Sequence, residues 1–242
     1  MRSPMLGEFM GTFILILLGN GVVAGVLLKR SKAENAGWMA ICTAWAFAVL
    51  CGIFTANLFG SPDAHLNPAF TLAFAITTHN YSKLVPFIAA QLAGAIVGAA
   101  TVYLFYKPFW AGTDDAEAKR ACFCTSPAIR SFPSNFISET IATFVLVLVA
   151  GAMGSKLVLS AGAANGVGPF LVSCVVWGVG LSLGGTTGYA INPARDLGPR
   201  IAHAILPISG KTTSDWAYAW VPALGPMLGG AIAGIILLSL GA

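Results

Sequence analysis

Two copies of an Asn-Pro-Ala triplet decide how this chain folds: His65-Leu66-Asn67-Pro68-Ala69 in the first half and Ala190-Ile191-Asn192-Pro193-Ala194 in the second. Asn is a favoured N-cap, and Pro suits the first helical position because its missing N–H would be unpaired there anyway. Each triplet therefore predicts the start of a helix. The segments that follow, 67–77 and 192–206, are too short to cross a bilayer, since eleven helical residues rise only roughly 16 Å.

The composition requires a nonpolar solvent around most of the surface. Of the 242 residues, 57% are hydrophobic and 9% are charged, whereas a soluble domain carries about 25% charged residues. Six apolar runs approach the roughly 20 residues that a spanning helix needs. They lie near 5–28, 38–59, 84–106, 135–154, 166–184 and 217–240. The first run contains Glu8 and reaches Leu28, which favours a spanning helix over a cleaved signal peptide.

The second half of the chain repeats the first. The matching stretches are Glu8-Phe-Met-Gly-Thr12-Phe13 with Glu139-Thr-Ile-Ala-Thr143-Phe144, and Gln91-Leu-Ala-Gly with Pro226-Met-Leu-Gly. Each half holds three spans and one short helix. Because three is odd, the second half must enter the membrane upside down, as an inverted repeat whose short helices meet near the midplane.

These observations predict an all-α membrane protein with six transmembrane helices plus two half-helices. We expect a single channel domain over 1–242, made of repeat one at about 1–106, a linking loop at about 107–133 and repeat two at about 134–242. The linking stretch is polar and too short to hold a core of its own, so we expect a hydrated loop.

Several function classes lack the residues they need. The net charge of +4 is scattered, so no basic cluster points to nucleic acid, and no phosphate-binding loop is present. Cys42, Cys51 and Cys174 lie in apolar runs, where Cys usually packs as a small hydrophobe. Cys122 and Cys124 lie in the linking stretch, and the five together match no zinc or disulfide framework. We therefore expect neither a metal nor a cofactor.

Two helix N-termini that meet in the membrane would create a selective site. Each carries roughly half a positive charge, so a cation meets an unfavourable potential between them. The amides of Asn67 and Asn192 can cap their helices through oxygen and still offer N–H donors to a passing neutral solute. Ala69 and Ala194 are small enough to let the helix ends approach each other.

The paired triplets, the repeated Glu8/Thr12 and Glu139/Thr143, and the six-plus-two layout resemble the aquaporin (major intrinsic protein) family over nearly the whole chain. The resemblance implies passive conduction of water or small neutral solutes, cytoplasmic termini and a homotetramer with one pore per subunit. The compact loops and short termini favour a bacterial plasma (inner) membrane. The loop charges by themselves would favour the opposite orientation. The orientation therefore rests on the resemblance.

Arg195 lies in the first turn of the second half-helix, where a cation is unfavourable, so we expect it to line the pore. In the family this arginine forms the narrowest constriction. Trp45, Gly180 and Tyr189 match the other constriction positions of the glycerol-conducting branch, in which Gly stands where water-selective members usually carry His. The predicted filter has two rings that contact the carbon backbone, Arg195 that donates to hydroxyls, and Gly180 that leaves room. The alternative for Trp45 and Tyr189 is an interfacial aromatic belt.

Four further residues are predicted to support the pore. Glu8 and Glu139 are costly carboxylates inside a membrane; we expect them to accept N–H groups of the segments before each triplet, as the family's equivalents do, rather than relay protons. His65 is expected to orient the first of these segments. Asp196 lies in the tetrad Ala194-Arg195-Asp196-Leu197, which resembles the glycerol-conducting branch, where Asp is usual at this position. A carboxylate is also favourable near a helix N-terminus.

The segments that lead into each triplet, Ala64–Leu66 and Tyr189–Ile191, should present backbone carbonyls along one wall of the path, with an apolar wall opposite. Three positions depart from the family pattern. Asp63 and Asn57 stand near positions that are commonly Gly, and Phe70 stands where Val is frequent. Asp63 would add a negative charge at the inner mouth.

The function predicted from these features is a passive channel for glycerol and other small uncharged polyols, which also passes water and excludes ions and protons. Alternatives are a water-selective channel, or a channel of this branch for lactic acid, urea or a metalloid acid. From other classes, an adhesion or scaffold protein would need an occluded pore. An enzyme would need a catalytic constellation, and His65, His79 and His203 are far apart in sequence.

Overall fold

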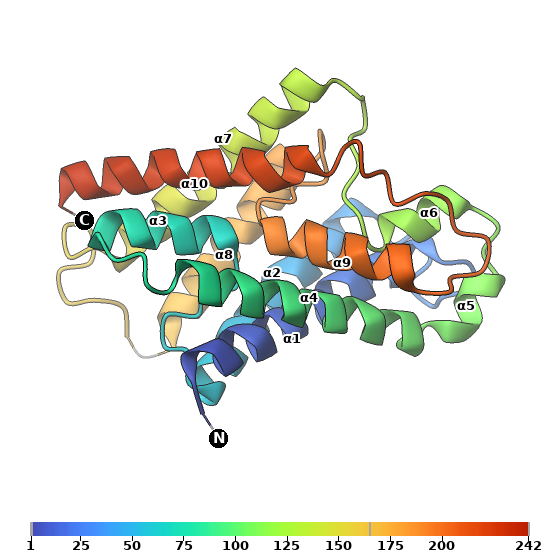
Figure 1. Cartoon of the computed structure of the whole chain (residues 1–242), viewed down its shortest axis with the longest axis horizontal. Helices are drawn as coiled ribbons and strands as arrows, with labels where there is room; N and C mark the ends of the chain where they lie inside the picture. Colours follow the sequence, from blue (N-terminus) through green and yellow to red (C-terminus); the bar gives the residue numbers. More distant parts are fainter. Residues whose placement is uncertain (1, 165, 242) are drawn as a thin grey trace.

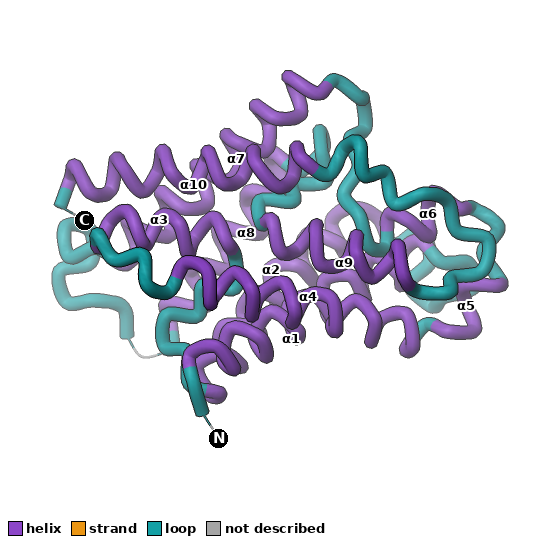
Figure 2. Tube along the Cα trace, in the orientation of Figure 1, coloured by secondary structure: helices purple, strands orange, loops and turns teal. Residues whose placement is uncertain are grey.

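The computed structural model describes residues 2–164 and 166–241, which form helices and loops without strands (Figures 1 and 2). Six long helices make up the body: α1 (Pro4–Leu27), α2 (Gly37–Phe59), α4 (Leu84–Phe105), α7 (Phe132–Gly154), α8 (Val167–Leu183) and α10 (Trp220–Leu240). Two half-helices, α3 (Pro68–Thr78) and α9 (Pro193–Ile205), begin at the Asn-Pro-Ala triplets. Short helices α5 (Lys107–Ala111) and α6 (Ala116–Ala121) lie in the linking stretch.

The long helices have the dimensions of membrane spans. Five of those described have both the length and the hydropathy to cross a bilayer, and α8 has 17 residues. That length is at the short end of the range of roughly 17–25 residues for a span. The predicted architecture of six spans and two half-helices is therefore confirmed.

The two halves interlock. Each half-helix packs against the third span of the other half, α3 against α10 and α9 against α4. The approach is close: a Cβ added to Gly230 would lie 2.6 Å from the Ala69 carbonyl oxygen, and one added to Gly198 would lie 2.4 Å from the Ala95 Cβ. Figure 1 shows α3 and α9 running in opposite directions from the middle of the molecule. Glycines at these crossings let each half-helix pack closely against the third span of the other half.

The prediction of a hydrated linking loop is wrong. Residues 107–131 contain α5 and α6 and bury large side chains, including Trp110 and Phe123, which are 1% and 0% exposed. Trp110 donates its indole N–H to the Tyr103 carbonyl at 2.9 Å, and the Phe123 ring packs against the His203 ring at 5.6 Å between centroids. The stretch folds back over the outer end of α9, and this burial depends on contacts that sequence polarity does not show.

Both cysteines of the linking stretch lie within this buried layer. The Cys122 thiol donates to the Ala118 carbonyl at 3.2 Å. Burial raises the pKa of the Cys122 thiol well above its ordinary value, and it raises the pKa of the Cys124 thiol to about 12. Since the thiolate is the reactive form, both side chains are protonated and shielded packing residues at neutral pH.

Candidate functional site

The segment before each triplet has an unusual backbone. Ala64 and Leu66 have φ angles of 44° and 52°, and Tyr189 and Ile191 have φ angles of 37° and 45°. Side chains other than Gly rarely adopt this left-handed region, and they do so only where the surroundings enforce it. Because every second residue is left-handed in both segments, the same extended, strained lead-in forms twice.

Glu8 of α1 enforces the first lead-in. Its carboxylate, fully buried, accepts the backbone N–H groups of His65 at 2.9 Å and Leu66 at 2.7 Å. It also accepts the Ser61 hydroxyl at 2.7 Å and the Gln91 amide at 2.8 Å. Four donors on one carboxylate offset much of the cost of burying its charge.

Glu139 of α7 holds the second lead-in in the corresponding way. It accepts the backbone N–H groups of Ala190 at 2.9 Å and Ile191 at 2.8 Å, and the Thr187 hydroxyl at 2.6 Å. The two glutamates are therefore placed as scaffold residues. All their short contacts fix backbone or neighbouring side chains.

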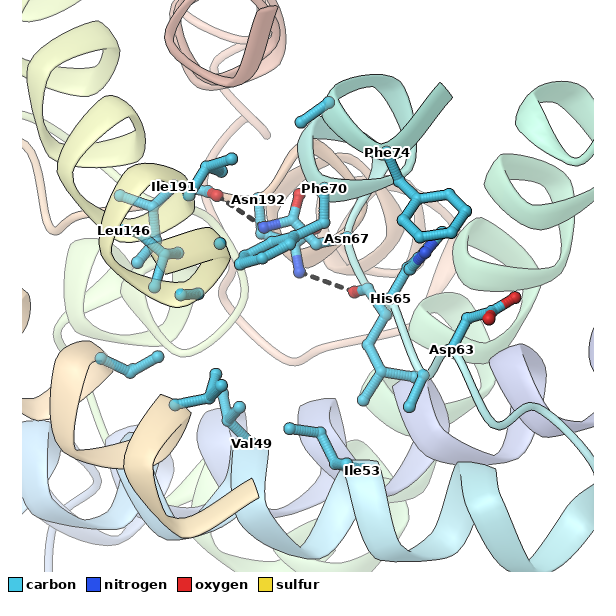
Figure 3. A pocket seen from close by; sticks show the side chains of 18 of the residues that line it. Val49, Ile53, Asp63, His65, Asn67, Phe70, Phe74, Leu146, Ile191 and Asn192 are labelled. Atoms are coloured by element: carbon cyan, nitrogen blue, oxygen red, sulfur yellow. Dashed lines mark hydrogen bonds between the residues drawn. The ribbon is translucent and has the colours of Figure 1, made fainter. Parts of the chain in front are cut away.

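The two asparagines cap their helices and cross-link the halves. Asn67 Oδ1 accepts the Ala69 N–H at 2.9 Å, and Asn192 Oδ1 accepts the Ala194 N–H at 3.0 Å. Each Nδ2 donates at 2.8 Å to a carbonyl of the opposite lead-in, Asn67 to Ile191 and Asn192 to Leu66, as the dashed lines in Figure 3 show. An amide nitrogen carries two N–H donors, so each asparagine keeps one for a solute. The structure brings all six residues of the triplets to this centre.

Arg195 and Trp45 meet face to face. The Arg195 guanidinium carbon lies 4.0 Å from the centroid of the Trp45 ring, and the two residues are 8% and 3% exposed. Among the hydrogen bonds of residues 2–164 and 166–241, none uses the guanidinium group. The side chain of Arg195 therefore has a full set of donors available where it is stacked on an aromatic ring.

Tyr189 and Gly180 complete this cluster. A Cβ added to Gly180 would lie 2.8 Å from Tyr189 Cζ, so the ring fills the space that the glycine leaves. The Trp38 ring packs edgewise on Tyr189 at 5.7 Å and donates its N–H to the Gly180 carbonyl at 3.1 Å. Trp45 and Tyr189 are both 3% exposed, which rules out positions in a lipid-facing aromatic belt.

A cavity of about 630 Å³ leads to the cluster from the side of the molecule where α3 and α7 end. One stripe of α2 at helical spacing lines it: Trp45, Val49, Ile53 and Asn57. Both lead-ins and both asparagines line the cavity as well. In Figure 3, Val49 and Ile53 lie across the space from Asn67 and His65. The cavity thus has both lead-ins on one side and the apolar side chains of Val49 and Ile53 on the other.

Sequence reasoning named Asp196 but missed the partners that hold it, Thr125 and Arg200. Asp196 accepts the backbone N–H of Thr125 at 2.8 Å and its hydroxyl at 2.6 Å, and it pairs with Arg200 at 2.7 Å. Arg200, fully buried, also donates to the carbonyls of Thr125, Ser214 and Asp215. Asp196 thus ties the linking stretch to α9. The one local signal in the sequence was the spacing of four between Asp196 and Arg200.

His65 lies in an aromatic sandwich beside the cavity. Its ring lies 4.9 Å from the Phe74 ring and 5.4 Å from the Phe87 ring, between centroids. The Lys83 ammonium lies over both phenyl rings and pairs with Asp63 at 2.5 Å. Asp63 therefore carries a paired charge where it lines the cavity. No cluster of three or more His, Cys, Asp or Glu side chains suited to a metal occurs in the part of the chain that the structure describes.

Comparisons with known proteins agree with this geometry. The model of the family described as "Major intrinsic protein" matches residues 2–237. The chain is 54% identical to the Lactiplantibacillus plantarum protein named glycerol uptake facilitator protein 3, over 98% of each chain. It is 51% identical to a probable glycerol uptake facilitator protein of Thermotoga maritima, over 94% of this chain and 95% of the relative. The solved aquaglyceroporin of Plasmodium falciparum superposes with a TM-score of 0.83 at 29% identity, covering 96% of this chain and 93% of that one.

These matches and the spanning helices confirm a multi-pass bacterial membrane protein that is a channel rather than an enzyme. The repeated triplets, the interlocked half-helices and the family match over residues 2–237 all lead to one conclusion. The chain belongs to the major intrinsic protein family.

Proposed function

We propose that this protein is a passive channel for glycerol and other small uncharged polyols, which also passes water. The observation that carries the proposal is the cluster of Trp45, Gly180, Tyr189 and Arg195 at the outer end of the cavity. Its guanidinium donors are unused within residues 2–164 and 166–241, and they lie beside two aromatic rings. A polyol presents hydroxyls on one edge and C–H groups on the other, and this filter offers a partner to each.

Beyond the filter, the solute passes the two asparagines. The free N–H of each amide donates to a hydroxyl oxygen, and the lead-in carbonyls accept hydroxyl protons. Val49 and Ile53 form the facing wall and contact the carbon backbone. These donors and acceptors replace the water molecules that the solute leaves behind, so a neutral solute stays hydrogen-bonded along the path. Flow is downhill and needs no nucleotide or coupled ion.

Ions are excluded by electrostatics in the same cavity. The N-termini of α3 and α9 meet at the centre, and each contributes roughly half a positive charge. Arg195 adds a full charge at the filter. Cations, including hydronium, meet this potential, and anions lose their hydration between apolar side chains with too few donors to replace it.

In the cell, we propose a homotetramer in the plasma membrane with one pore per subunit and both termini in the cytoplasm. Large apolar side chains such as Phe105 and Val85, 75% and 74% exposed, supply the surface that lipid and neighbouring subunits would cover. Cross-linking of the protein in native membranes to a fourfold mass would support the assembly.

The proposal is tested by stopped-flow light scattering on proteoliposomes, with an osmotic step of glycerol compared with one of sucrose. Wild-type vesicles should shrink and then reswell rapidly in glycerol. Gly180→His should abolish reswelling, because even its Cβ would clash with Tyr189. Gly178→His is the matched control, since a Cβ there meets open space. Rapid shrinkage without reswelling in the wild type would instead indicate a water-selective channel.

A further inference from the structure

The cavity contains two groups of buried polar atoms that lack partners. Among the described cavity-lining residues, the atoms are Trp45 Nε1, Tyr189 Oη, Asn57 Oδ1 and both ring nitrogens of His65. A buried polar atom without a hydrogen bond costs about 1–3 kcal/mol, so each one needs an explanation. Trp45 Nε1 and Tyr189 Oη lie in the filter described above. Asn57 and His65 lie elsewhere in the cavity.

Asn57 and His65 lie toward the inner end of the cavity. Asn57 is twelve residues after Trp45 on the same stripe of α2, which places it about 18 Å further along the helix axis. It lies next to the end of α2, where the Ser3 N–H donates to the Phe59 carbonyl. His65 lines the same end from the first lead-in. The partnerless atoms therefore form two groups that are separated by the apolar side chains of Val49 and Ile53.

We propose that Asn57 and the His65 imidazole form a second solute-binding subsite, which takes the hydroxyl groups of a neutral polyol at the inner end of the pore. This inference rests on the proposed function and adds to it. A neutral imidazole offers one donor and one acceptor, and an amide offers both. Ile53 lies one turn before Asn57 and Phe74 lies against His65, so apolar side chains flank the polar atoms as they do in the filter.

The surrounding charges favour an uncharged ligand. Near Asn57, Arg2 donates to its backbone carbonyl at 3.1 Å, which disfavours a cation. Near His65, the carboxylate of Asp63 is paired with Lys83, and the Glu8 carboxylate lies beneath the lead-in. An anionic carboxylate gains little there, because Lys83 is already paired. A solute that has just crossed the apolar stretch recovers hydrogen bonds at this point, before it meets bulk water.

The test measures the permeability of proteoliposomes to glycerol, to 1,2-propanediol and to water. Asn57→Ala removes the amide and only adds room, so a loss of flux cannot come from occlusion. We expect the ratio of glycerol to propanediol permeability to fall about fivefold, the worth of one neutral hydrogen bond, because glycerol has one more hydroxyl to satisfy. His65→Phe keeps the aromatic sandwich, removes both nitrogens and should lower the ratio similarly. Water permeability should stay within twofold of the wild type.

The matched control is Leu58→Ala, the same replacement at the next residue, which is 67% exposed on the outer surface of α2. It should keep the wild-type ratio. An unchanged ratio in Asn57→Ala, with water permeability retained, overturns the subsite even if His65→Phe fails to fold. A wild type that passes no glycerol overturns the proposed function and the subsite together. If the wild type conducts glycerol but Asn57→Ala keeps the wild-type permeability ratio, the subsite alone is overturned.

Discussion

The two lead-ins share one design but differ in what supports them. In the first half, Glu8 has four donors, and the fourth comes from Gln91 of α4. In the second half, Glu139 has three, because Pro226 occupies the position in α10 that corresponds to Gln91. Additional support for the second half comes instead from Asp196 and Arg200, which tie α9 to the linking stretch. The two halves share the glutamates that position the triplets, and they differ in the residues around these glutamates.

The divergence extends to the pore wall. Phe70 and Arg195 hold the same place after their triplets, and both line the cavity. One adds an apolar ring to the inner half, and the other adds a cation to the filter. The comparison teaches that the symmetric part of this molecule builds a pore, while its asymmetric part selects the solute.

Removal of the glutamates that the two halves share should have the largest effect on stability. Glu8→Ala or Glu139→Ala leaves two buried backbone N–H groups and further donors without an acceptor, at about 1–3 kcal/mol each. We expect a loss of at least about 3 kcal/mol in either half and little monodisperse protein in detergent. The readouts are unfolding temperature and size-exclusion profile.

Glu34→Ala is the control for this pair, because Glu34 pairs with Lys29 in an exposed loop. It should leave the unfolding temperature almost unchanged. If only one of the two buried glutamates proved necessary, the two lead-ins would not be equivalent.

The support found only in the second half should rank next. Arg200→Met leaves the Asp196 carboxylate buried and unpaired, which typically costs about 3–5 kcal/mol. We expect the linking stretch to detach and become sensitive to protease at 107–131, while the first half keeps its structure.

A double variant separates charge from packing. Asp196→Asn with Arg200→Met keeps an acceptor for the Thr125 N–H and removes the unpaired charge, so it should be more stable than Arg200→Met. Equal stability of the two variants in a denaturant titration would show that the unpaired carboxylate is not the cause.

The support found only in the first half should have a smaller effect. Gln91→Leu removes one donor to a carboxylate, worth about 1.5–3 kcal/mol, and the second half shows that the design works with three donors. We expect lower stability in denaturant with glycerol flux preserved. A variant as stable as the wild type would mean that Gln91 contributes through its shape alone.

The outer surface should give the smallest effect, and one that depends on pH. Partial burial tends to raise the pKa of Asp215, but the hydrogen bond and charge of Arg130 outweigh it, and the pKa lies below its ordinary value. A lowered folded-state pKa adds stability above the unfolded value, near pH 4, and this stability disappears as the pH falls through the folded value. Because the Arg130 side chain is 43% exposed and solvent screens its charge, we expect less than about 1 kcal/mol.

Arg130→Met should therefore lower the unfolding temperature slightly at pH 7, and by less at an acidic pH below about 4. An equal loss at both pH values would assign the effect to the packing of Arg130 on Phe132 and Tyr218 rather than to charge.

Much of the fold can be predicted from local and periodic patterns in the sequence. The capped triplets, the six apolar runs and the repeated glutamates predict where helices begin and that the halves are inverted. Trp45 is assigned to the filter through the resemblance to the family, and helical spacing places Asn57 on the same stripe of α2. These features are visible because each depends on residues within a few turns of one another.

The rest depends on contacts between distant segments. Arg200 meets Thr125 across 75 positions, and Gln91 meets Glu8 across 83. The linking stretch reads as polar, yet Trp110 and Phe123 are buried because the outer ends of α4 and α9 cover them. Polarity along a sequence does not report which surface a loop will fold against.

The interlocking of the halves has a consequence for biogenesis. When a ribosome has released the first repeat, α3 can contact α4, but its main neighbour, α10, is the last helix to be made. The cross-links from Asn67 to Ile191 and from Asn192 to Leu66 also need both halves. The conducting path is thus completed only when synthesis ends, so a nascent or truncated chain cannot leak solute across the membrane through a finished pore.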